Sequence, residues 1–169
     1  FIREYDFVQL TSGAVDQLKT ELFELLDGVE DEDLKKLLKL FQNDESLMDK
    51  FSRAPAGIKN HHAYNGGLLS HVVSMLRVAS FVGDHYKAVS KDLLLTGVLL
   101  HDIGKIDELA YEKELSYTDQ GQLIGHIQMG AEILAAKIRE LEATGNTFPD
   151  EKALRLKHMI LSHHGEPQF

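Results

Sequence analysis

Apolar residues recur every three or four positions along most of the chain, which is the pattern of helices that bury one face. In AVDQLKTELFELLDG the leucines share a face, and Gly28 favours the end of that helix. Pro55 ends another predicted helix, and Ser90 is suited to cap the start of a third. The pattern predicts helices over the ranges 14–28, 31–44, 44–55, 67–86, 90–105, 122–145 and 151–164.

The helical period breaks between Ile106 and Gly121. We expect an all-α fold, a helical bundle with a short hairpin or irregular insertion near 106–121. Residues 1–52 would form a linker and helices that pack on the core, and residues 53–169 would form the catalytic domain. The first helices carry no constellation of reactive side chains, so packing is sufficient to explain them.

Composition restricts the possible chemistry. The chain has 169 residues, 43% of them hydrophobic and none of them cysteine, which indicates one globular domain without disulfides, thiolate catalysis or cysteine–zinc sites. The formal net charge is −9, a poor match for long nucleic acids, so phosphate chemistry here would need metal ions. We find no span long enough for a bilayer and no signal peptide, and therefore expect no membrane partner and a cytoplasmic location.

The segment LLHDIGKIDE at 99–108 ends an apolar helix with adjacent His101 and Asp102. Three other predicted helices also carry histidines in apolar surroundings, spaced too widely for a zinc finger but suited to ligands that line a bundle. Imidazole with carboxylate suits Mn, Fe, Co, Ni or Zn. Asp102 could bridge two such ions about 3.5–4 Å apart, with a hydroxide between them as nucleophile. The candidate ligands are His71, His101, Asp102, His126, His163 and His164.

Lys105 follows Asp102 by one turn, and its ammonium could neutralise a phosphate oxygen that gains charge during the reaction. Alternatively, Lys105 interacts only with the helix dipole. A single buried histidine is more often a hydrogen-bonded core residue than a ligand. Four helices that each bury an unpaired imidazole would be costly without a common purpose, which favours the metal hypothesis.

Other candidate residues lie outside this set. His61, His62 and Tyr64 could bind phosphate or stack on a base at the mouth of the site, or they could cap the helix that follows. We expect His158 to support a metal ligand or to have a structural role rather than to bind metal, because it lies five residues before His163 and faces elsewhere on the helix.

The order of His71, the HD pair and the later histidines resembles the HD superfamily of metal-dependent phosphohydrolases, from about position 60 to 165. The segments HHAYNGGLLSHVVSM, LLLTGVLLHDIGKIDEL, GQLIGHI and LKHMILSHHG resemble more closely the YhaM-type 3′–5′ exoribonucleases. That resemblance implies single-stranded RNA, and often DNA, as substrate, with Mn²⁺ favoured and Mg²⁺ also possible. It also implies an upstream OB-fold domain, to which FIREYDFVQLTSG would be the linker, so we expect this chain to be part of a longer protein.

The resemblance assigns His71, His101 and Asp102 to one metal ion. It assigns Asp102, His126 and one of His163 and His164 to a second ion, and we favour His163. A further aspartate that this family uses does not occur before the sequence ends, so we expect a domain that is incomplete at its C-terminus.

Several alternatives remain open. The sequence also resembles the HD-GYP phosphodiesterases but lacks a GYP element, and Gly67 stands where they often carry a glutamate. The substrate could be a free nucleotide or a cyclic dinucleotide, or the domain could be a non-catalytic module that binds nucleotides. The acidic N-terminal helices could pack on their own domain or on another subunit, which leaves a homo-oligomer open.

Overall fold

The computed structural model describes residues 10–57, 64–110 and 116–165, and these residues are almost entirely helical. The predicted all-α fold is confirmed. The two short strands pair antiparallel, Leu109 with Tyr117 and Ala110 with Ser116. In chain order the elements are α1 Ser12–Asp27, α2 Glu32–Asn43, α3 Glu45–Arg53, α4 Gly67–His85, α5 Lys91–Leu100, α6 Lys105–Glu108, β1 Leu109–Ala110, β2 Ser116–Tyr117, α7 Asp119–Leu123, α8 His126–Ala143 and α9 Asp150–Ser162.

Polar side chains fix where several helices begin. The Ser90 hydroxyl accepts a hydrogen bond from the Leu93 amide at the start of α5, as the sequence predicts. Asp31 and Asp44 accept backbone amides in the same way at the starts of α2 and α3. These oxygens satisfy amides that have no partner within the first turn of a helix.

Two predicted helices are interrupted in the structure, and both interruptions lie near the candidate site. The predicted helix over 90–105 ends at Leu100, and a turn carries the chain to α6. The predicted helix over 122–145 is wrong in its first turn, because Gly125 has a φ of 78° that a helix cannot accommodate. His126 therefore becomes the first residue of α8 rather than an interior one.

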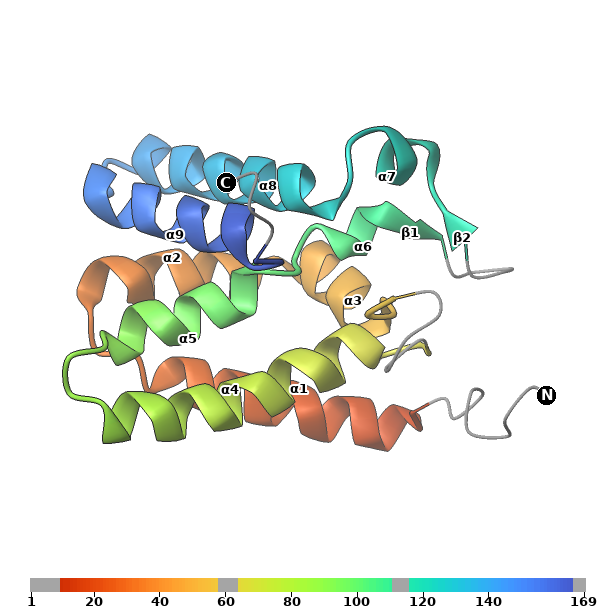
Figure 1. Ribbon diagram of the computed structural model, residues 1–169, viewed down its shortest axis with the longest axis horizontal. Coiled ribbons are helices and arrows are strands. Elements are labelled where there is room, and N and C mark those ends of the chain that lie inside the picture. The colour runs from red at the N-terminus through yellow and green to blue at the C-terminus, as the bar shows by residue number, and fades with distance from the viewer. Residues whose placement is uncertain (1–9, 58–63, 111–115, 166–169) are drawn as a thin grey trace.

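Figure 1 shows how the helices are arranged. Most of them contribute to one hydrophobic core. Side chains from α1, α2 and α3 contribute to the same core as those from α4, α5, α8 and α9. Helix α5 packs against both α4 and α9, and α8 packs beside α9. Among the described residues, none of the helices has the length and apolar character that crossing a membrane would require.

Candidate metal centre

The turn that follows α5 places His101 and Asp102 at the centre of the site. Leu99 and Leu100 anchor the end of α5 in the core, so the next two side chains emerge among packed helices. Asp102 is only 4% exposed. Gly104 allows this turn to cross α8 closely, because a Cβ at this position would lie 2.1 Å from the His126 carbonyl oxygen.

Five histidines surround the Asp102 carboxylate. Its Oδ2 lies 3.3 Å from His101 Nε2 and 3.7 Å from His71 Nε2. Its Oδ1 lies 3.5 Å from the Nε2 atoms of both His126 and His163. The donor atoms form two groups, each within 4.8 Å: His71, His101 and Asp102, and the cluster of His126, His163 and His164. Asp102 thus faces one group with each oxygen.

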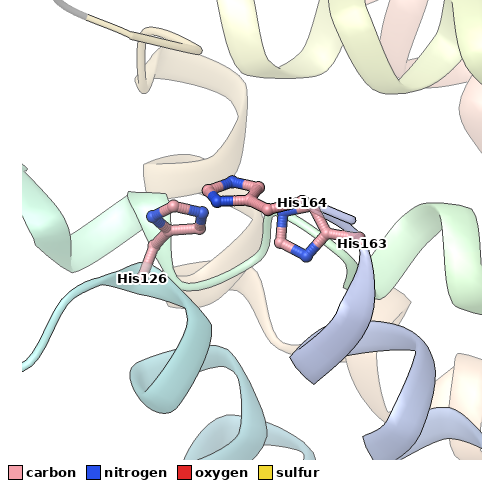
Figure 2. Close-up of side chains that lie close together, drawn as sticks. All are labelled: His126, His163 and His164. Carbon is pink, nitrogen blue, oxygen red and sulfur yellow. The ribbon is translucent and has the colours of Figure 1, made fainter. Parts of the chain in front are cut away.

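Figure 2 shows the second group, with the His126 imidazole at the start of α8 and the other two just after α9. Both His163 and His164 belong to this group, so the structure brings the two together rather than selecting one of them.

In three of the imidazoles, the Nδ1 atom, which points away from Asp102, is held by a hydrogen bond. His101 Nδ1 lies 2.7 Å from the Val98 carbonyl oxygen, and His163 Nδ1 lies 2.7 Å from that of Ile160. A carbonyl can only accept, so each Nδ1 carries the proton and each Nε2 presents a lone pair towards Asp102 when the ring is neutral. This is the arrangement by which metal-binding histidines are usually oriented.

Glu108 orients the third ring, and sequence reasoning missed it. Its Oε1 lies 2.9 Å from His126 Nδ1 and accepts the His126 backbone amide at 3.0 Å. The side chain is buried, whereas neighbouring Asp107 forms a more exposed ion pair with Lys50. Burial alone would raise the pKa of Glu108, but the hydrogen bonds and charge of His126 lower it overall. Glu108 therefore stays ionised as a partner for the ring and for the start of α8.

Charges around the centre keep Asp102 ionised. Burial alone would raise the pKa of Asp102, but its interactions with His101 and His163 and the charge of Lys105 hold it far below its usual range. Burial works to lower the pKa of His163, but its interaction with Asp102 raises it overall. Burial and the neighbouring histidines lower the pKa of His164.

Lys105 is fixed beside the Asp102 carboxylate. Its Nζ donates to Asp102 Oδ2 and to the Ala56 carbonyl oxygen, both at 2.8 Å. The lysine side chain is 16% exposed and lines the cavity at the site. Its charge therefore lies beside the carboxylate, at a place that a bound phosphate could reach.

Buried polar atoms at the centre fit a bound cation. Asp102 Oδ1, His126 Nε2 and His163 Nε2 are buried and have no hydrogen-bond partner within the described residues. His71 Nε2 and His101 Nε2 lie only 3.3 Å apart. Unpaired buried polar atoms are costly, and a metal ion would satisfy them. Mixed imidazole and carboxylate donors suit transition metals.

Two of the other candidate residues, Tyr64 and His158, do not belong to these donor groups. Tyr64 is half-buried in the turn that leads into α4, and its carbonyl accepts the Gly67 amide. His61 and His62 lie outside the described residues. His158 is exposed on α9 and belongs to neither donor group, so its expected supporting or structural role stays a prediction.

Comparison with known proteins gives one family and several relatives. The HD domain family model matches residues 68–168. A protein of Listeria welshimeri named 3′-5′ exoribonuclease YhaM is 39% identical over 154 residues, covering 91% of this chain and 46% of the relative. Proteins of the same name from Shouchella clausii and Bacillus licheniformis are 34% and 43% identical, over 97% and 71% of this chain and 49% and 37% of the relatives. The chain spans about half the length of the first of these relatives. No solved structure matches significantly.

Proposed function

The chain belongs to the HD domain family, and on this basis we propose that it is the catalytic domain of a metal-dependent 3′–5′ exonuclease that degrades single-stranded RNA. The relatives named 3′-5′ exoribonuclease support the direction and the substrate. The observation that carries the proposal is the position of Asp102 between two groups of imidazoles, beside unpartnered buried atoms.

We propose that two divalent ions bind here, with Mn²⁺ favoured. His71, His101 and Asp102 would hold one ion, and Asp102, His126 and His163 would hold the other, with His164 as a further donor to it. When bound, such ions activate water for attack on a phosphodiester and stabilise the charge that develops.

The protein's own residues orient the reacting groups. The Asp102 carboxylate offers one oxygen to each side, and its ion pairs keep it charged although it is buried. The Lys105 ammonium counters charge on the scissile phosphate, and its bond to the Ala56 carbonyl prevents it from turning away. Glu108 holds the His126 ring in place without contacting the substrate.

A gel assay tests the function. The full-length protein that carries this sequence is incubated with 5′-labelled single-stranded RNA, with Mn²⁺ or with chelator. We expect a Mn²⁺-dependent ladder that shortens from the 3′ end and is abolished by Asp102→Ala. The control is Asp16→Ala, which removes an exposed carboxylate on α1 and should change nothing. Absence of RNA cleavage by protein with bound metal would contradict the proposal and favour a free nucleotide or a cyclic dinucleotide as substrate.

The remaining proposals concern the setting of this domain. A chain with a net charge of −9 has little basic surface for single-stranded RNA, so an attached OB-fold domain would supply it. We also propose a cytoplasmic location, which an RNA substrate would fit. A homo-oligomer is compatible with these assignments, and sedimentation of the full-length protein would test it.

A further inference from the structure

The metal centre opens into a cavity of about 360 Å³ that is lined by two kinds of residue. Asp102, Lys105 and the imidazoles of His71, His101, His163 and His164 are polar. The remaining lining residues are apolar: Met75 of α4, Gly97 and Val98 of α5, and Met159 of α9. We name the side chains of Met75 and Met159, together with the α5 surface at Gly97 and Val98, the methionine wall. The catalytic groups and the apolar surface therefore belong to one continuous pocket.

Gly97 makes the methionine wall possible. A Cβ at position 97 would lie 2.0 Å from Met159 Cε and 2.7 Å from its Sδ. Because glycine has no Cβ, the Met159 side chain can lie directly against the backbone of α5. Met75 is 37% exposed, so its thioether is accessible where the pocket opens. The wall thus presents two thioethers beside the metal centre.

The size of the cavity favours a single small group over a folded nucleic acid. Pockets that bind small ligands usually span about 300–1,000 Å³, and this cavity lies near the lower limit. A substrate whose phosphate reaches Asp102 and Lys105 would place its adjoining nucleoside in the rest of the same cavity. The terminal nucleotide of a chain fits that description.

The chemistry of the methionine wall favours binding of an aromatic group through apolar contacts rather than through hydrogen bonds. Thioether sulfur is polarisable and makes favourable contacts with aromatic rings, and the flexible methionine side chain adapts to different shapes. Recognition of one particular base requires hydrogen bonds to its edges. Among the described residues that line the cavity, the hydrogen-bonding side chains are Asp102, Lys105 and the histidines of the metal centre, and the methionine wall supplies none.

We propose that the methionine wall holds the base of the terminal nucleotide and accepts all four bases. This inference rests on the proposed function. It adds that the protein recognises the terminal base as well as the phosphate. The contact is apolar, so it contributes to binding without selecting a sequence.

A cycle of enzyme and substrate variants tests the proposal. RNA with an ordinary 3′-terminal nucleotide is compared with the same RNA ending in an abasic riboside, using the Mn²⁺-loaded full-length protein. Met159→Ala should lower kcat/KM on the ordinary RNA by about 2- to 10-fold, the strength of thioether–aromatic contacts. On the abasic RNA the same variant should have no effect. Equal losses on both substrates would overturn the proposal, because they would indicate a structural role.

Matched variants separate the wall from general packing. Leu154→Ala removes an exposed apolar side chain from the same helix and should leave both substrates unaffected. Met75→Ala changes a partly exposed residue and should repeat the base-dependent loss without disturbing the fold, which circular dichroism can check. Wild-type rates on RNAs that end in each of the four bases should agree within about tenfold. A stronger preference for one base would contradict the proposed tolerance.

A binding experiment distinguishes failure of this proposal from failure of the proposed function. Titration calorimetry compares adenosine 5′-monophosphate with ribose 5-phosphate on the Mn²⁺-loaded protein. The nucleotide should bind about 2- to 10-fold more tightly, and Met159→Ala should remove that difference. If RNA is not cleaved, the exonuclease proposal fails, whereas equal affinities for the two ligands would overturn the methionine wall.

Discussion

Replacing Glu108 should weaken one metal site while leaving the metal ligands intact. The Glu108 carboxylate is the partner of both the ring and the backbone amide of His126. In Glu108→Ala the imidazole can rotate and its Nε2 is no longer held towards Asp102. Loss of such a supporting carboxylate typically costs about 10- to 100-fold in metal affinity, equivalent to about 1.4–2.7 kcal/mol. The buried His126 amide would also lose its partner, which destabilises the fold by about 1–3 kcal/mol.

The assay is a titration of the metal-free protein with Mn²⁺, followed by electron paramagnetic resonance and calorimetry. We expect two sites in the wild type and one weakened site in Glu108→Ala. Glu108→Gln keeps an oxygen that can accept from His126 and should recover part of the affinity. The matched control is Asp107→Asn, which alters the adjacent carboxylate in its pair with Lys50 and should leave both sites unchanged.

Wild-type affinity at both sites in a folded Glu108→Ala protein would refute this reasoning. It would mean that packing alone orients His126 and that the carboxylate serves only the start of α8. Equal weakening by Asp107→Asn would also contradict it, because the effect would then arise from the charge of α6 rather than from the contact.

Three further outcomes follow from contacts at and beyond the centre. Lys105→Met keeps the aliphatic stem and should lower turnover about 100-fold with metal content unchanged; loss of metal would instead assign Lys105 to holding Asp102. Gly104→Ala should reduce both metal affinity and stability, by more than about 1 kcal/mol in urea unfolding, because the new Cβ would lie 2.1 Å from a backbone oxygen of α8. The hydrogen bond from Lys137 and, to a smaller extent, that from the Leu47 backbone amide lower the pKa of Asp44 below its usual value. Asp44→Asn should therefore cost about 1 kcal/mol at neutral pH, and the deficit should shrink as acid protonates the wild-type carboxylate through its folded pKa; a deficit independent of pH would contradict this.

The helices and the donor residues could be predicted because both follow from local sequence. Apolar spacing defines each helix, and an imidazole next to a carboxylate at a helix end is visible in the HD pair itself. The structure places His71, His101, His126 and His163 around Asp102, and their role as metal ligands stays a prediction.

Other features depend on contacts that sequence spacing does not encode. Glu108 and Asp107 are adjacent acidic residues, and only the approach of α8 separates a buried partner of His126 from a more exposed one. The helix break at Gly125 likewise depends on a positive φ that periodicity does not reveal. The contact between Gly97 and Met159 joins two helices that are distant in sequence, so neither residue is distinguished by its neighbours.

The donor atoms around Asp102 come from four segments that run from position 71 to position 164. In an unfolded chain these atoms are scattered, so an ion that requires several of them binds only the folded protein. Such an ion would act as a removable cross-link. Because it binds the folded state alone, its binding adds to the free energy of unfolding. Metal at 100 times its dissociation constant would raise the free energy of unfolding by about 2.7 kcal/mol. Chelation should therefore lower the melting temperature as well as stop hydrolysis, so that metal supply would govern the lifetime of the domain together with its activity.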